Sequence, residues 1–113
     1  MLLQYLVEEI EKETKGNLNI EINKIEYDSK KIEKGDLFVA IEGLKQDGHD
    51  YINEAIENGA AAVVISKNKI DSVTIPEEIA LVITENTRIT LAKLSAKYYD
   101  YPASKLRIIG VTG

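Results

Sequence analysis

Two unbroken apolar runs constrain the fold of this chain most strongly. They lie at 60–66 (AAAVVIS) and 79–84 (IALVIT). A strand buried on both faces has a continuous apolar sequence, whereas a strand with one face in water alternates. Such strands occur in parallel sheets that are covered by helices on both sides. Because 113 residues are enough for one domain, we expect a single small α/β domain whose mostly parallel sheet is flanked by helices.

The remaining apolar residues predict the other elements of this domain. Leu3, Leu6 and Ile10 repeat at helical spacing with acidic residues between them, which is typical of an amphipathic helix. The segment from Leu18 to Tyr27 alternates imperfectly and predicts a strand with an irregular middle. The complete expectation is helices at 2–14, 47–58 and 86–99, and strands at 18–27, 36–41, 60–66, 79–84 and 106–111.

Turn and cap residues set the boundaries of these elements. Asp47 can accept hydrogen bonds from the first turn of the second helix, and Gly59 can end that helix with a positive φ. Residues 67–78 are polar and include a proline, so we expect a loop there. Pro102 should prevent the third helix from continuing beyond about Tyr99.

Composition excludes several classes of function. The net charge is −5, whereas a surface that binds nucleic acid or an anionic membrane needs a basic face. There is no cysteine, and the single histidine, His49, poorly supports a metal cluster or a Ser-His-Asp triad. No apolar run reaches the ~18 residues of a transmembrane helix, and no signal peptide is recognisable. We therefore expect a cytoplasmic protein without a nucleic-acid or membrane partner.

Polar residues at strand ends are the candidates for a binding site. Tyr27 ends the first predicted strand and Ser29 lies just beyond it, and a loop containing Leu44, Lys45 and Gln46 follows the second. Open α/β sheets bind ligands at the carboxyl ends of their strands. The Ser29 hydroxyl can donate to and accept from a ligand, and an aromatic ring such as Tyr27 can lie against a base.

Each candidate also has a purely structural interpretation. Ser29 can cap a turn, Tyr27 can pack on the sheet, and the loop around Lys45 can simply be solvated. Asp47 and Gly48 are assigned to the start of a helix, and His49 to an exposed or capping position. The aspartates lack the spacing of a calcium loop, so we expect no metal ligand. No catalytic residue is predicted.

Three stretches of the sequence resemble the N-terminal domain of the Mur ligase family. They are YDSKKIEKGDLFVAIEGLKQDGHDYINEAIENGAAAVV at 27–64, NTR at 86–88, and YYDYPASKLRIIGVTG at 98–113. The family usually has Asp-Ser-Arg where this chain has Asp28-Ser29-Lys30, which keeps the charge and loses the guanidinium fork. Members of the family continue beyond GVTG with the rest of an ATP-binding loop.

The resemblance implies a function. Residues 1–106 would form the UDP-substrate-binding domain of a ligase of peptidoglycan synthesis, and 107–113 would begin its central ATP-binding domain. That ligase uses ATP and Mg²⁺ to add L-lysine or meso-diaminopimelate to UDP-N-acetylmuramoyl-L-alanyl-D-glutamate. Tyr27, Ser29, Leu44, Lys45 and Gln46 would contact the UDP-substrate.

The resemblance also implies what this chain lacks. Gly113 would be part of an incomplete ATP loop, so we expect this piece alone to bind no cofactor and to have no activity. Activity would require the central and C-terminal domains of the ligase. Two alternatives stay open. One is the N-terminal domain of the related ligase that adds D-alanyl-D-alanine, and the other is a stand-alone nucleotide-binding or interaction module. The abrupt end at Gly113 argues against a stand-alone module.

Overall fold

A single five-stranded sheet organises the chain. The computed structural model describes residues 1–43 and 45–106, and the side chains of 1–43 and 45–99. The strand order is β1-β5-β4-β3-β2, and only β1 runs antiparallel to its neighbour. The prediction of a mostly parallel sheet is therefore confirmed. The strands are β1 (Glu13–Lys15), β2 (Ile25–Glu26), β3 (Leu37–Val39), β4 (Ala62–Ser66) and β5 (Ala80–Thr84).

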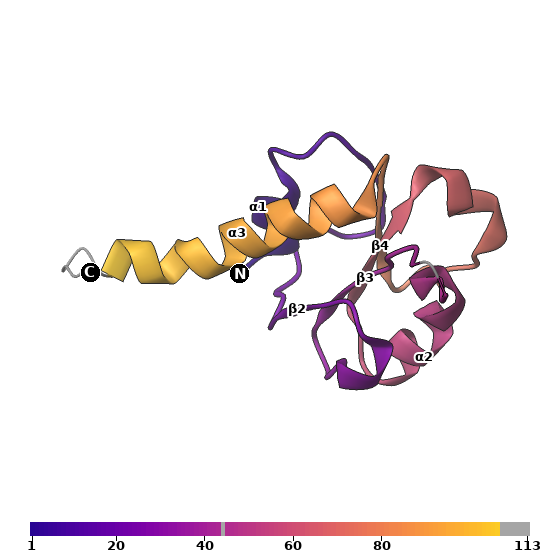
Figure 1. Cartoon of the computed structure of the whole chain (residues 1–113). Helices are drawn as coiled ribbons and strands as arrows, with labels where there is room; N and C mark the ends of the chain where they lie inside the picture. The colour runs from indigo at the N-terminus through magenta and orange to yellow at the C-terminus, as the bar shows by residue number, and fades with distance from the viewer. Residues whose placement is uncertain (44, 107–113) are drawn as a thin grey trace.

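Helices cover both faces of the sheet, as the two apolar runs predict (Figure 1). One face is covered by α1 (Leu3–Val7) and α3 (Thr87–Leu106), and the other by α2 (Ile52–Glu57). Short 3-10 helices occupy three connections: η1 (Ser29–Lys31), η2 (Gly48–Tyr51) and η3 (Lys67–Ser72).

Successive residues of the central strands enter opposite cores. In β5, Val82 packs in the core beneath α1 and α3, while Ile83 packs in the core beneath α2. Every residue of β3, β4 and β5 is buried. Burying an apolar side chain contributes about 1.5–3 kcal/mol, so this double burial is what requires the unbroken apolar sequences.

The structure corrects the predicted N-terminal helix over 2–14. The helix α1 ends at Val7, and Glu13–Lys15 forms β1, which pairs with β5 in the register Thr14–Val82. All three residues of β1 are exposed. Their position in the sheet depends on backbone pairing with β5. The spacing of apolar residues within this segment cannot predict such a pairing.

The predicted strand over 18–27 is also shorter than expected, because only Ile25 and Glu26 form a strand. The earlier part of this segment bonds instead to the start of the chain. Leu3 N–H donates to the Ile20 carbonyl at 2.9 Å, and Ile22 N–H donates to the Met1 carbonyl at 2.8 Å. The segment thus satisfies backbone groups beside α1 rather than extending the sheet.

The helix α3 continues beyond the predicted end at Tyr99 and includes Pro102. Proline removes a single backbone donor, so a helix can continue through it when the turns on either side stay bonded. Of the strand predicted over 106–111, Leu106 lies in α3, and the other residues lie outside the described chain. The predicted loop over 67–78 contains η3.

Contacts along α3 fix it across one face of the sheet before it extends past the domain (Figure 1). The Lys97 ammonium lies 4.0 Å from the Tyr5 ring centroid and 3.1 Å from the Glu8 carboxylate. The Tyr98 hydroxyl donates to the Asn23 carbonyl, just before β2. Among the described residues, no helix is long and apolar enough to cross a membrane.

Replacing Gly59 by alanine should destabilise the domain severely. Gly59 ends α2 with φ +117°, and an added Cβ would lie 2.6 Å from the Lys34 Cα. A side chain at such a φ costs about 1–2 kcal/mol, and the backbone clash adds to that cost. We expect Gly59→Ala to lower the free energy of unfolding by about 3 kcal/mol or more, measured by urea denaturation. Glu57→Ala, on the exposed side of the same helix, should change it by less than about 0.5 kcal/mol; equal effects would contradict the assignment.

Candidate functional site

A cleft of about 620 Å³ opens beside the carboxyl ends of β2 and β3. Parallel strands bring their carboxyl ends to the same edge, so chain segments that are distant in sequence meet there. The cleft is lined by Tyr27, Asp28, Ser29, Lys30, Phe38, Ile41, Gly43, Lys45, Gln46, Gly48, Tyr51 and Arg88. Its size is that of a small-molecule site.

Four of the predicted site residues meet in this cleft: Tyr27, Ser29, Lys45 and Gln46. Leu44, the fifth, lies outside the described residues, as does Gly113 of the predicted ATP loop. The cleft thus combines the two strand ends that the sequence singled out. Their role in binding the UDP-substrate stays a prediction.

Tyr27 does not pack on the sheet. Its side chain is 61% exposed, although most large apolar and aromatic residues of the chain are covered. The backbone N–H of Tyr27 is bonded to the Glu26 carboxylate at 3.1 Å, which fixes the turn after β2. An exposed ring on the wall of a cleft is available to stack on a planar ligand.

Ser29 is held by α2 rather than projecting freely. The residue is 5% exposed, and its hydroxyl donates to Glu54 Oε1 at 2.7 Å. Its carbonyl accepts from the Asn58 amide at 2.9 Å. Because the hydroxyl proton is committed to Glu54, the oxygen can serve a ligand only as an acceptor.

The loop between β3 and α2 is closed by its own backbone. Gly43 N–H donates to the Gln46 carbonyl at 2.8 Å, and Gly48 N–H donates to the Ile41 carbonyl at 2.8 Å. A Cβ at Gly48 would lie 2.6 Å from the Ile41 nitrogen, so this close approach requires glycine. The side chain of Asp47 caps η2 by accepting from His49 N–H at 2.9 Å, which confirms the predicted helix start.

His49 is neither exposed nor a cap, in contrast to the sequence prediction. It is 6% exposed, and both ring nitrogens are bonded. Its Nε2 accepts from Ser66 N–H at 3.0 Å, and its Nδ1 lies 2.7 Å from Asp47 Oδ1. Because Ser66 supplies the proton of the first bond, the ring carries its own proton on Nδ1. Nothing in the local sequence identifies Ser66 as the partner.

Asp47 is the most strongly perturbed acid at this edge. Burial would by itself raise the pKa of its carboxyl, but hydrogen bonds from Lys69, the His49 N–H and the His49 ring lower the pKa to about 2. The Lys69 ammonium lies 2.8 Å from Asp47 and 3.6 Å from Glu42. The hydrogen bond to Asp47 raises the pKa of Lys69 in turn. Asp47 therefore stays ionised and holds the base of the loop.

The cleft is cationic in a chain whose net charge is −5. Lys30, Lys45 and Arg88 line it against the single carboxylate of Asp28. Sequence reasoning missed Lys30 and Arg88 as site residues, although Arg88 belongs to the NTR motif. The Arg88 guanidinium also donates to the Glu42 carbonyl at 2.9 Å, which ties α3 to the loop. Such a site favours an anionic ligand that also carries a planar group.

A comparison with known protein families identifies the relationship of this chain. Residues 21–99 match the model described as "Mur ligase family, catalytic domain". The chain belongs to the Mur ligase family. This match contains β2 to β5 and most of α3, so the same fold that forms the cleft carries the family relationship.

Curated relatives agree with the family assignment. A UDP-N-acetylmuramoyl-L-alanyl-D-glutamate–2,6-diaminopimelate ligase 2 of Clostridium acetobutylicum is 42% identical over 114 residues, which cover all of this chain and 23% of that protein. The corresponding ligase of Oceanobacillus iheyensis is 44% identical over 95 residues, covering 84% of this chain and 18% of that protein. The chain therefore spans about a fifth of the length of these Mur ligases.

Solved structures of Mur ligases share the fold. The UDP-N-acetylmuramoylalanyl-D-glutamyl-2,6-diaminopimelate–D-alanyl-D-alanyl ligase of Acinetobacter baumannii aligns with a TM-score of 0.66 and 26% identity, over 81% of this chain and 20% of that one. The MurF ligase of Thermotoga maritima in complex with ADP aligns with a TM-score of 0.53 and 35% identity, over 63% of this chain and 15% of that one. The α/β fold is thus the one that these ligases contain.

The Asp47 carboxylate should make stability depend on pH in acid. Its pKa in the folded chain is about 2, below the ordinary value of 3.8, so the folded state binds its proton less readily than the unfolded state. The stabilisation is complete above about pH 5 and is lost as the pH falls towards 2, and amounts to up to about 2 kcal/mol. Urea denaturation of wild type and Asp47→Asn between pH 2 and 6 measures it.

Two lysine variants provide the comparison for this pH profile. Lys69→Met removes the hydrogen bond that contributes most to lowering the pKa of Asp47, so the loss of stability in acid should become smaller. Lys67→Met changes an exposed neighbour that pairs with Glu13 and Glu85 instead, and should keep the wild-type profile. A flattened profile in Lys67→Met, or an unchanged one in Asp47→Asn, would contradict the assignment.

Proposed function

We propose that this chain is the N-terminal UDP-substrate-binding domain of a Mur ligase that extends UDP-N-acetylmuramoyl-L-alanyl-D-glutamate by a diamino acid in peptidoglycan synthesis. The observation that carries the proposal is the cleft at the carboxyl edge, where Tyr27, Ser29, Lys45 and Gln46 meet. The sequence predicts each of these four residues as a contact of the UDP-substrate. Their convergence on one cationic cleft supports a site for a nucleoside diphosphate.

Each wall of the cleft matches one part of such a ligand. The exposed ring of Tyr27 offers a stacking surface for a base. The Ser29 oxygen offers an acceptor for a ring or ribose donor. Lys30 and Lys45 add two ammonium charges to the lining, which would attract a diphosphate. Leu44, within the same loop, completes the proposed set of contacts.

The domain would contribute to the reaction by remote binding. In the reaction proposed for the whole ligase, ATP phosphorylates the D-glutamate carboxylate, and the amine of the diamino acid then displaces phosphate to form an amide. ATP and Mg²⁺ would be held by the central domain, which we propose begins at residue 107, with Gly113 in its phosphate loop. Holding the UDP end orients the distant carboxylate and lowers the entropic cost of reaction.

The relatives favour this ligase over the one that adds D-alanyl-D-alanine. Sequence identity is 42% and 44% to two ligases named for 2,6-diaminopimelate, but 26% to the D-alanyl-D-alanyl ligase and 35% to the MurF ligase. By the same names, diaminopimelate is favoured over lysine as the added amino acid. We place the enzyme in the cytoplasm, where ATP and the UDP-linked substrate are made. The partners of this domain would be the substrate and the central and C-terminal domains.

Removing either free ammonium group of the cleft should weaken UDP binding. The Lys30 and Lys45 side chains are exposed and line the cleft. We expect Lys30→Met and Lys45→Met each to raise the dissociation constant for UDP about 3–10-fold, because each removes one charge from the diphosphate site. Isothermal titration calorimetry at low ionic strength measures the effect, which should shrink as salt is added.

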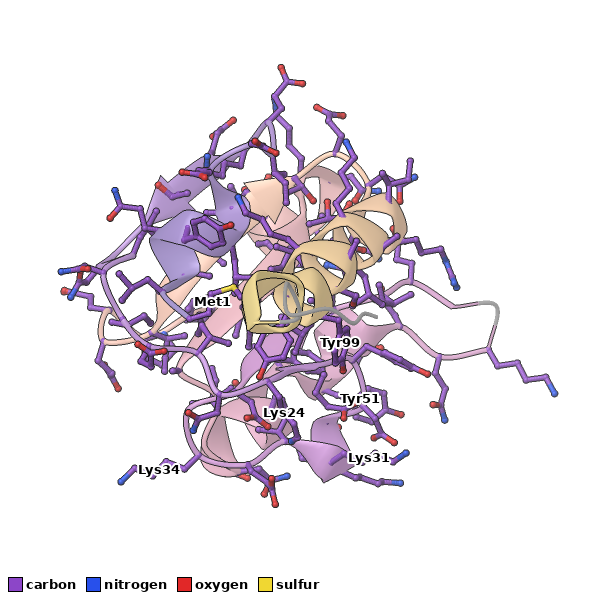
Figure 2. The ribbon with its side chains drawn as sticks, turned by 90° about the vertical axis from the view of Figure 1, so that its left-hand side faces the viewer. Met1, Lys24, Lys31, Lys34, Tyr51 and Tyr99 are labelled. Carbon is purple, nitrogen blue, oxygen red and sulfur yellow. The ribbon has the colours of Figure 1, made fainter. Side chains whose placement is uncertain are left out.

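Lys34→Met is the matched control for this experiment. Lys34 is also an exposed lysine, but it projects into solvent on the side away from Tyr51 of the cleft (Figure 2). Its replacement changes the net charge equally and should leave UDP affinity within twofold of wild type. If all three variants weaken binding alike, the effect is one of net charge, and the proposed diphosphate site is wrong.

A further inference from the structure

A partly buried chain of polar contacts connects the end of β4 to the loop that lines the cleft. It begins at Ser66 N–H, passes through the His49 ring to Asp47, and ends at Lys69. This chain of contacts joins the end of β4 and the loop to two 3-10 helices. Ser66 ends β4 and Asp47 ends the loop, while His49 lies in η2 and Lys69 in η3. None of these four residues lines the cleft.

The bonds of His49 link the end of the loop to the central sheet. Asp47 pairs with Glu42 across the base of the loop in an antiparallel bridge, so moving Asp47 also moves the residues between them. Lys45 and Gln46, which line the cleft, lie within this span. Backbone bonds close the loop on itself, but the Asp47–His49–Ser66 link attaches it to the central sheet.

We propose that His49 is a positioning residue for the cleft. Its imidazole, with the proton on Nδ1, attaches the loop to the sheet in the conformation that places Lys45 and Gln46 against the ligand. The effect on UDP affinity rests on the function proposed above, whereas the effect on the loop does not. The role of His49 in the loop and the proposed binding of UDP can therefore be disproved independently of each other.

The chemistry of this position requires an acceptor and a donor on a single rigid side chain. Nε2 must accept from a backbone N–H, and Nδ1–H must donate to a carboxylate whose second oxygen binds Lys69. Leucine supplies neither group and leaves the Ser66 N–H without its partner. Glutamine can place its side-chain oxygen near Nε2 and so retains the bond to Ser66.

The experiment compares His49→Leu, His49→Gln and a control variant that loses stability in another part of the domain. Val7→Ala is the control, because Val7 is fully buried in α1 on the opposite face of the sheet. The first measurement is amide hydrogen exchange at Gly43 and Gly48, relative to Val63 in β4, in the ligand-free chain. Both glycine N–H groups are bonded within the loop. The second is the dissociation constant for UDP.

The proposal predicts a local effect. His49→Leu should speed exchange at Gly43 and Gly48 about tenfold relative to Val63, His49→Gln should restore part of the protection, and Val7→Ala should leave the ratio unchanged. UDP affinity should fall about tenfold in His49→Leu and by less than twofold in Val7→Ala. Long-range ¹H–¹⁵N spectra should place the ring proton on Nδ1.

Several results would overturn it. An unchanged exchange ratio in His49→Leu, or an equal change in Val7→Ala, shows that His49 supports the whole domain and not the loop. A ring proton on Nε2 would contradict the hydrogen-bond scheme. If the wild-type chain bound no UDP, the proposed function would fail, and the exchange measurement would still decide the role of His49.

Discussion

Burial of the three central strands on both faces is the constraint on which the structure depends. Every residue of β3, β4 and β5 is covered, and Phe38 alone among these strand residues lines the cleft. Function is therefore confined to the strand ends, and parallel pairing collects those ends at one edge of the sheet. The cleft follows from this arrangement, because the turn after β2 and the loop after β3 lie beside each other there. The same double burial gave the strands their recognisable apolar sequences.

The edge of the sheet is polar, and its polar groups satisfy one another. Ser29 is bonded to α2, Asp47 to His49 and Lys69, and Arg88 to the loop backbone. In the described chain, no buried side-chain polar atom lacks a hydrogen-bond partner. Lys30 and Lys45 line the cleft with exposed side chains that take no part in these bonds. They are therefore available to a ligand, whereas the bonded residues build the site. A rigid frame with a few free charges suits binding at a distance from the chemistry.

Local sequence patterns predicted the strands at 60–66 and 79–84 and the cap at Asp47, because each depends on neighbouring residues only. These patterns failed where a residue distant in the sequence determines the local structure. Glu13–Lys15 forms a strand because β5 offers it a free edge, and the buried state of His49 depends on a backbone N–H seventeen positions away. The candidate site was found in part, since four of its residues lie at or just after the ends of predicted strands. Arg88 could be predicted as a residue of the cleft only if the position of α3, which begins at the same edge of the sheet, were known.

Chemical-shift mapping of this chain with UDP tests the central claim most directly. Amide signals would be followed as UDP is added to the ¹⁵N-labelled chain. The account predicts saturable changes at Tyr27 and Ser29 and at Lys45 and Gln46, with the α1 side of the sheet undisturbed. Saturable binding that maps to α1 or β1, or no binding at millimolar UDP, would contradict it.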